Sequence, residues 1–134
     1  MQKIAVILPT DHYHPALNRI SLSLADGFAS LGESVVTATI TSRPEMLALY
    51  KMLADGEIRL LVGVNDTASA FNDGMGDCYL AKLNTPTLSY LLDAPYNTCA
   101  GDLSFQAPHK FIAVVDRSHA ALIPKLYSGG GDPR

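Results

Sequence analysis

A short polar segment near the start of the chain, residues 9–15, carries Asp11, His12 and His14. One residue separates the two histidines, so on an extended backbone both imidazoles point the same way. A general base or a pair of metal ligands can use such an arrangement. Histidines on a loop flanked by proline are also common as surface or capping residues, and the sequence leaves both interpretations open.

A second polar segment, residues 93–99, carries Asp93, Tyr96 and Asn97 directly after an apolar run. Pro95 restricts the backbone of this segment. An open α/β sheet presents its ligand site in this way, on a polar turn at the carboxyl end of a buried strand. The segment therefore predicts the location of a ligand site, but it does not define a reaction.

Five apolar segments predict the strands that must position these turns. They cover residues 3–8, 34–40, 58–64, 87–92 and 111–115. Helical segments alternate with them. The first is an amphipathic stripe that recurs at steps of three and four residues, formed by Leu17, Ile20, Leu24, Phe28 and Leu31.

Local signals predict where the helices begin and end. Gly32 is expected to close the first helix in the left-handed conformation, and the second helix is expected to end at Gly56. Ser42 and Glu45 have the spacing of a capping box for the second helix. A short helix is expected at about residues 78–83, and Asp116 or Ser118 can cap the last helix.

The alternation of strands and helices predicts an α/β fold. We expect a three-layer sandwich with a doubly wound, parallel, five-stranded sheet of the Rossmann or flavodoxin-like kind. The expected strand order is 3-2-1-4-5, which makes the carboxyl ends of strands one and four neighbours and brings both polar turns to one crevice. Residues 1–127 are expected to form a single domain, followed by a flexible glycine-rich tail at residues 128–134.

The composition argues against several classes of function. The chain has 134 residues, 48% of them hydrophobic and 17% charged, as in a well-buried globular domain. A net charge of −3, with ten Lys and Arg that form no run, argues against nucleic acid as a partner. The apolar runs are shorter than the roughly 20 residues of a membrane span. A strand pattern follows Met1 almost directly, so no signal peptide is expected and cytoplasmic residence is the default.

We predict no cofactor and no metal site. The turn after the first strand contains no glycine, which a dinucleotide-binding or phosphate-binding loop needs. Cys78 and Cys99 lack the paired spacing of a zinc site. Four acids are expected at one edge of the sheet and would suit a divalent cation, although Asp is also favoured after strands and at helix N-caps. These acids are Asp11, Asp66, Asp93 and Asp116.

Three segments carry a family resemblance. They are the opening strand and helix KIAVILPTDHYHPALNRISLSLADGFASLG, the proline-led strand PTLSYLLDAPY, and the last strand with its sequel FIAVVDRSHAALIPKLY. Together they resemble the N-terminal lobe of bacterial glycosyltransferases of the two-Rossmann-lobe (GT-B) type. The second segment departs from the family pattern at Ala94, where such enzymes have His. In this family the N-terminal lobe mainly holds the acceptor, and a C-terminal lobe holds the sugar nucleotide.

The resemblance implies an acceptor-side domain that is not catalytically complete by itself. Its expected partners are a small sugar or polar ligand and a C-terminal nucleotide-sugar lobe. Asp93 or His12 would then be the base for an acceptor hydroxyl. The residues expected to contact the ligand are Asp11, His14, Tyr96 and Asn97.

Two other classes of function remain open. The same residues fit a stand-alone flavodoxin-like module that binds a small ligand or regulates another protein. Such a module can be a monomer or a homodimer. A third interpretation is a structural protein that uses a sheet edge or a helix face for oligomerisation. The sequence therefore leaves open whether the chain is an enzyme.

Overall fold

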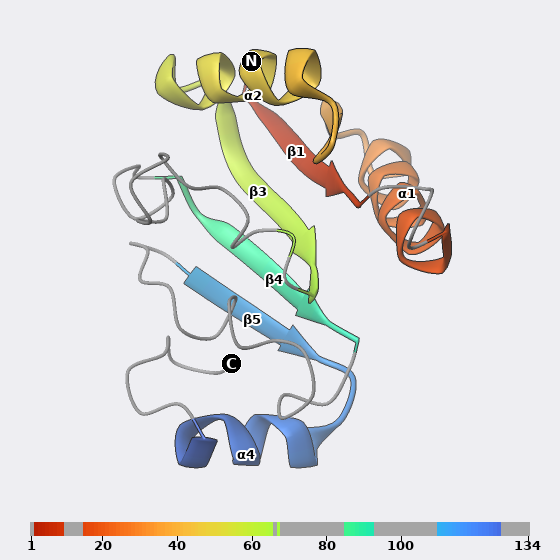
Figure 1. The fold of residues 1–134 in the computed structure, drawn as a ribbon, viewed down its shortest axis with the longest axis vertical. Helices are drawn as coiled ribbons and strands as arrows, with labels where there is room; N and C mark the ends of the chain where they lie inside the picture. Colours follow the sequence, from red (N-terminus) through yellow and green to blue (C-terminus); the bar gives the residue numbers. More distant parts are fainter. Residues whose placement is uncertain (1, 10–14, 66, 68–84, 93–109, 127–134) are drawn as a thin grey trace.

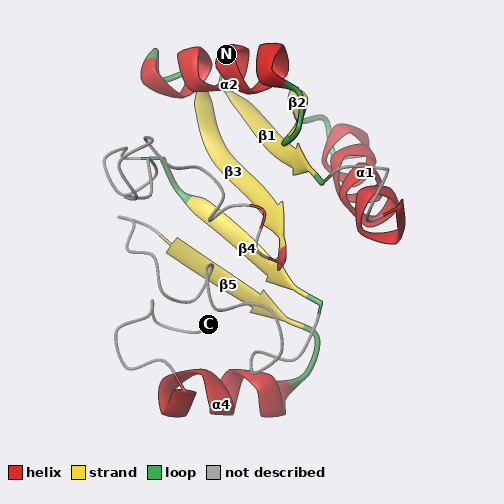
Figure 2. Ribbon diagram, in the orientation of Figure 1, coloured by secondary structure: helices red, strands yellow, loops and turns green. Residues whose placement is uncertain are grey.

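The computed structural model describes residues 2–9, 15–65, 67, 85–92 and 110–126. In this part of the chain there are five strands and three helices (Figures 1 and 2). In chain order they are β1 (Lys3–Leu8), α1 (Pro15–Ser30), β2 (Val35–Thr39), α2 (Arg43–Ala54), β3 (Ile58–Val64), β4 (Thr87–Leu91), β5 (Lys110–Val114) and α4 (Arg117–Leu126). The expected helix at residues 78–83 and the glycine-rich tail lie outside the described residues.

The strands form one parallel sheet with the order β2-β1-β3-β4-β5. The two helices between the first three strands pack on opposite faces of this sheet. The predicted α/β class, with helices on both sides of a parallel five-stranded sheet, is therefore confirmed. Its strand order is the flavodoxin-like one.

The predicted strand order 3-2-1-4-5 is wrong, because β3 lies between β1 and β4. Burial explains the difference. Four consecutive residues at the end of β3 are buried, as in a strand covered on both faces. In contrast, β2 has one buried residue, Ala38, and an exposed Thr37, as suits the edge of a sheet. The predicted order would have placed the more apolar strand at the edge and the more polar strand inside.

β1 supplies side chains to both hydrophobic cores, because alternate residues of a strand point to opposite faces. Ala5 and Ile7 pack with Leu49 and the other apolar residues of α2. Ile4 and Val6, together with Leu8, pack on the other face with α1. Because β2 and β3 lie on opposite sides of β1, the two crossovers run in opposite directions, and right-handed crossovers then require helices on opposite faces.

The inner side of α1 differs from the predicted apolar stripe. Its buried residues are the small or polar Asn18, Ser21 and Ala25, while Leu24 and Phe28 are partly buried beside them. The Ser21 hydroxyl donates to the Leu17 carbonyl one turn earlier, at 2.9 Å, which satisfies its donor inside the helix. Small side chains along this line let the helix backbone approach the sheet closely. Leu31, predicted to lie on the stripe, follows the helix and is 79% exposed.

The glycine predictions for the helix ends are confirmed, but the capping box is not. Gly32 and Gly56 have φ angles of +88° and +73°, in the left-handed region. Ser42 is the N-cap of α2, yet its side chain makes no capping hydrogen bond. Glu45 accepts a hydrogen bond from the Thr39 backbone N–H at 2.6 Å instead. The carboxylate thus links the first turn of α2 to the end of β2.

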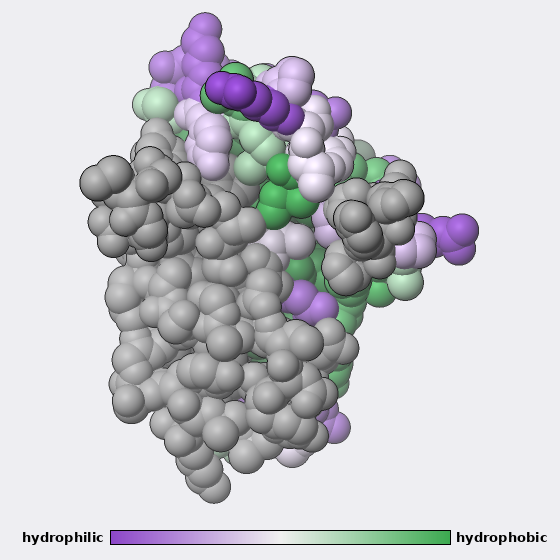
Figure 3. Space-filling model, in the orientation of Figure 1, coloured by the Kyte–Doolittle hydropathy of each residue, from purple (hydrophilic) through white to green (hydrophobic). Residues whose placement is uncertain are grey.

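Among the described helices, none is long and apolar enough to cross a membrane. The outer surface of α2 carries charged side chains beside the exposed Leu47. Figure 3 shows hydrophilic side chains gathered over α2 at the top of the molecule, where Arg43, Glu45 and Lys51 are exposed.

Replacing Leu49 by Ala should lower the free energy of unfolding by about 2–5 kcal/mol, because Leu49 is fully buried between α2 and the sheet. The matched control is Leu47→Ala in the same helix, where the side chain is 55% exposed, and this change should stay within about 0.5 kcal/mol of wild type. Urea unfolding followed by circular dichroism measures both. Equal losses for the two variants would contradict this packing of α2.

Candidate functional site

The observed strand order moves the topological switch point of the sheet. From β1 the chain passes to β2 on one side and then returns to β3 on the other, so the switch lies between β1 and β3. In open α/β sheets, ligands bind outside the carboxyl ends of the strands at such a point. The candidate site therefore begins at the ends of β1 and β3, after the buried residues Leu8 and Val64.

Asn65 shapes the turn at the end of β3. It has a φ angle of +52°, the only positive value at a non-glycine residue in the described part of the chain. Asn tolerates this left-handed conformation better than most residues. Its side chain is 7% exposed, and its Oδ1 atom accepts a hydrogen bond from the Leu92 backbone N–H at 2.9 Å. Asn65 therefore ties the carboxyl end of β3 to the carboxyl end of β4.

Thr67 adds a second local contact to this turn. Its hydroxyl donates to the Val64 carbonyl at 2.9 Å, which satisfies the last carbonyl of β3. Together, Asn65 and Thr67 hold the carboxyl edge in a defined shape through side-chain bonds to backbone. Neither residue was among the predicted site residues. The available sequence signal was an Asn directly after a buried strand, a position where its side chain can bond to nearby backbone.

The six predicted site residues all lie outside the described residues. Three of them follow β1 in the sequence, and the other three follow β4. They are Asp11, His12, His14, Asp93, Tyr96 and Asn97. The expectation that strands one and four are neighbours is wrong, because β3 separates them. The ends of β1 and β4 are therefore two strand spacings apart, about 10 Å.

Asp116 follows β5 and caps a helix. This capping role was the alternative to metal binding in the sequence analysis. Asp116 precedes α4, and its Oδ1 atom accepts hydrogen bonds from the Ser118 backbone N–H at 2.7 Å and the Ser118 hydroxyl at 2.6 Å. The Asp116 carbonyl also accepts from the His119 N–H at 3.1 Å. Asp116 is therefore the N-cap of the last helix.

These contacts also lower the pKa of Asp116. The hydrogen bond from the Ser118 hydroxyl, followed by that from the Ser118 N–H, holds the pKa of Asp116 below its usual value of 3.8. A smaller electrostatic contribution from His119 acts in the same direction, while desolvation opposes it. Elsewhere in the described residues, no group of three or more His, Cys, Asp or Glu side chains could hold a metal ion.

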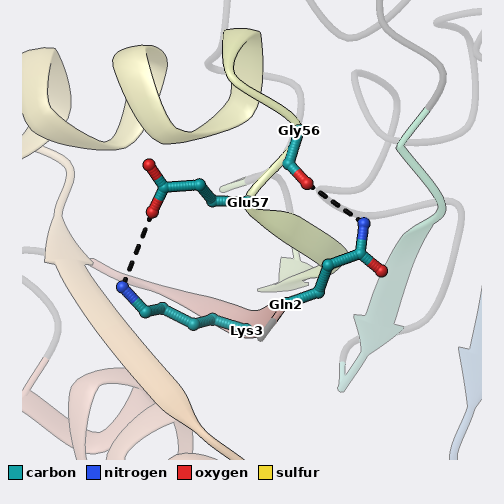
Figure 4. A network of polar contacts seen from close by, with 4 residues as sticks. All are labelled: Gln2, Lys3, Gly56 and Glu57. Carbon is teal, nitrogen blue, oxygen red and sulfur yellow. Dashed lines mark hydrogen bonds and ion pairs between the residues drawn. The ribbon is translucent and has the colours of Figure 1, made fainter.

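The opposite edge of the sheet, at the amino ends of the strands, uses its polar groups to bind the chain to itself (Figure 4). The Gln2 side-chain amide donates to the Gly56 carbonyl at 3.0 Å, and the Lys3 Nζ atom lies 3.6 Å from a Glu57 carboxylate oxygen. The Lys3 backbone N–H donates to the Glu57 carbonyl at 2.7 Å. These contacts join the starts of β1 and β3. Because the polar groups named here already bond within the chain, the carboxyl edge is the better candidate for ligand binding.

β4 carries buried hydroxyl groups that its apolar appearance in the sequence conceals. Thr87 and Ser89 are buried and face the same side of the sheet as α2, because Thr87 is in register with Leu61 of the α2 core. Thr85, two residues before the strand begins, is buried as well. The Thr87 hydroxyl donates to the Thr85 carbonyl at 3.4 Å. Within the described region, the Ser89 hydroxyl and the His119 Nδ1 atom are buried without a hydrogen-bond partner.

Comparisons with known proteins assign no family to this arrangement. No family model matches the chain, and no significant match was found among curated proteins or solved structures. The fold and the geometry of the carboxyl edge are therefore the observations on which a function can be proposed.

Substitutions at Asn65 should separate its backbone role from its hydrogen bond. Asn65→Gly keeps the positive φ but leaves the Leu92 N–H without its acceptor, which should cost about 1–3 kcal/mol of unfolding free energy. Asn65→Ala loses the same bond and adds about 1–2 kcal/mol of left-handed strain. Asn65→Asp retains an acceptor oxygen and should cost least. Urea unfolding measures the series, and an Ala variant no less stable than the Gly variant would contradict the strained turn.

The Asp116 cap should make stability depend on pH. Because its pKa is lower in the folded chain than the unfolded value of 3.8, its contribution is present above that value and is lost as the pH falls through the folded pKa. The melting temperature of Asp116→Ala should therefore lie below that of wild type at neutral pH, and the gap should narrow as the pH falls below 3.8. Asp26→Asn, on the exposed side of α1, controls for the loss of one carboxylate. If the difference in melting temperature between wild type and Asp116→Ala did not change with pH, the ionised Asp116 side chain would not be the stabilising cap.

Proposed function

We propose that the chain is a flavodoxin-like module that binds a small polar ligand at the carboxyl edge of its sheet, beside the ends of β1 and β3. The observation that carries this proposal is the strand order, which puts the topological switch point between these two strands. The turn at the end of β3 supports it, because Asn65 and Thr67 fix the backbone at this point and a preorganised site loses less freedom on binding.

The residues that follow β1 and β4 in the sequence have polar side chains that suit such a ligand. Asp11, His12 and His14 follow β1, and Asp93, Tyr96 and Asn97 follow β4. Carboxylates accept hydrogen bonds from hydroxyl and amine groups, and neutral imidazole and amide groups both donate and accept them. The proposed ligand is therefore a small molecule rich in hydroxyl or amine groups, such as a sugar.

The acceptor-side lobe of a glycosyltransferase remains a prediction from the sequence. The alternation of strands and helices led us to expect the order 3-2-1-4-5, whereas the sheet has the flavodoxin-like order, with its switch point between β1 and β3. We therefore prefer the binding module, in which Asp93 and His12 contact the ligand. In the alternative, one of them is a base for an acceptor hydroxyl.

The first test is a thermal-shift screen of the purified chain against sugar nucleotides, simple glycans and divalent ions. A ligand that binds only the folded chain, present at a hundredfold excess over its dissociation constant, should stabilise it by about 2.7 kcal/mol. Asp93→Ala should abolish that shift without lowering the melting temperature of the free chain. Glu57→Gln, at the opposite edge of the sheet, is the matched control and should keep the shift.

Nitrogen-15 NMR titration with the ligand found in this way locates the site. Amide signals of Leu8, Asn65 and Leu92, at the carboxyl ends of the strands, should move, while those of Lys3 and Ile58 at the amino ends should stay. Shifts confined to the amino ends, or a screen without any stabilising compound, would overturn the proposed site. A response to glycans fits both interpretations, because an acceptor-side lobe and a sugar-binding module would contact the same hydroxyl groups.

A further inference from the structure

β3 and β4 run side by side in the same direction, and their ladder of hydrogen bonds predicts the acceptor of the Leu92 N–H (Figure 1). In a parallel pair, every second residue of a strand bonds to the same neighbour with both its N–H and its C=O. Leu61 of β3 donates its N–H to the carbonyl of Pro86, just before β4, and in this register the Leu61 carbonyl faces the Leu88 N–H. Four residues further along both strands, the Asn65 backbone carbonyl should face the Leu92 N–H.

The structure satisfies the Leu92 N–H with a different atom of the same residue. The N–H donates to the Asn65 side-chain oxygen, Oδ1, at 2.9 Å. The φ angle of +52° at Asn65 takes its backbone out of the extended conformation that a ladder needs. Because a side-chain amide carries the same kind of C=O group as a peptide, its oxygen replaces the backbone acceptor. The β3 backbone therefore leaves the sheet at Asn65 while Leu92 keeps its hydrogen bond.

The carboxyl edge of the sheet has a step at this position. β1 ends at Leu8 and β3 at Val64, and these two residues lie in one row of the sheet with Tyr90 of β4. β4 and β5 continue one residue further, to Leu91 and its partner in β5, which is a rise of about 3.3 Å. The Leu92 N–H lies at the top of this step and points toward β3. The switch point between β1 and β3 therefore lies at the foot of the step.

We propose that Asn65 is a positioning residue of the ligand site, because its side-chain amide holds the Leu92 peptide at this step beside the switch point. Leu92 directly precedes Asp93 in the sequence, so the held peptide is the one from which the polar segment 93–97 starts. The inference rests on the proposed function and adds to that site a residue that acts through its neighbour. Asn65 sets where the segment leaves the sheet, and the side chains of the segment contact the ligand.

Burial strengthens the bond between Asn65 and Leu92. Asn65 is 7% exposed and Leu91, the residue before the donor, is fully buried, so water competes little for the bond. Thr67 makes a contact of a different kind, because its hydroxyl donates to the Val64 carbonyl within the turn that follows β3. Thr67 thus shapes the turn itself, whereas Asn65 joins the turn to β4. The two residues therefore give a comparison between a local contact and one that reaches the next strand.

Scalar coupling across the hydrogen bond tests this contact in the full chain without any ligand. Nuclei on the two sides of a hydrogen bond are coupled, so the Leu92 amide nitrogen should correlate with the carbon of its acceptor. We expect the correlation with the Asn65 side-chain carbon, Cγ, and Asn65→Asp should keep it. A correlation with the Asn65 backbone carbonyl carbon would show a regular ladder and overturn the proposal. Absence of both correlations, while the Leu61 amide nitrogen correlates with the Pro86 carbonyl carbon, would overturn it as well.

Amide hydrogen exchange of the Asn65→Gly variant tests whether the side chain holds Leu92. Glycine keeps the left-handed backbone accessible and removes the acceptor. Exchange of the Leu92 N–H should become about tenfold faster relative to that of the Leu61 N–H in the same ladder. Thr67→Val is the matched control, because it removes a hydroxyl contact of the same turn that does not reach β4, and the ratio should stay at the wild-type value. The same ratio in wild type and Asn65→Gly would contradict the positioning role.

Isothermal titration calorimetry with UDP-glucose, maltose and Mg²⁺, one probe from each group of the thermal-shift screen, measures the effect on binding. For a probe that binds wild type, Asn65→Gly should weaken binding by about tenfold or more, because the segment loses its fixed start. Asn65→Asp should restore most of the affinity.

The control for lost stability is Leu53→Ala, because Leu53 is buried in the α2 core, and it should keep the wild-type affinity. Equal affinity of wild type and Asn65→Gly would overturn the positioning role and leave the ligand site in place. A wild-type chain that binds none of the three probes would instead overturn the proposed function, and with it the role of Asn65 in binding. The coupling measurement decides the contact between Asn65 and Leu92 in either case.

Discussion

Burial of β1 on both faces is the constraint on which the rest of this structure depends. Every residue from Ile4 to Leu8 is buried, so the strand needs a helix on each face and a neighbouring strand on each side. Placing β2 and β3 on opposite sides of β1 meets both requirements, because the two crossovers then deliver α1 to one face and α2 to the other. The flavodoxin-like strand order follows from this arrangement.

The same arrangement separates the functions of the sheet's two ends. At the amino ends, Gln2, Lys3 and Glu57 bond within the chain and join β1 to β3. At the carboxyl ends, a strained residue, Asn65, joins β3 to β4. A left-handed residue that is not glycine persists only where surrounding contacts fix it, and such residues cluster at ligand sites. This contrast supports a ligand site at the carboxyl edge.

The lateral edges of the sheet differ as well. β2 is more polar and has Thr37 exposed, whereas β5 is apolar and exposes Phe111 beside Val115. Flanking charges are one way in which proteins control pairing at an edge strand. Lys110 is the first residue of β5, and Asp116 follows the end of the strand.

The sequence by itself determined the α/β class, the approximate positions of the described strands and helices, and the left-handed Gly32 after α1, because these depend on periodicity and local backbone preference. It also limited the cap of the last helix to Asp116 or Ser118, and the structure selects Asp116. Only the tertiary structure decided the strand order, since that depends on which strand is buried on both faces. It also decided that Glu45 bonds to Thr39 in place of Ser42, that Ser21 and Ala25 face the sheet, and that Asn65 joins two strands. The Asn65 bond joins segments distant in sequence, the positions of Ser21 and Ala25 result from packing on the sheet, and Glu45 has two competing local partners, so local patterns encode none of these.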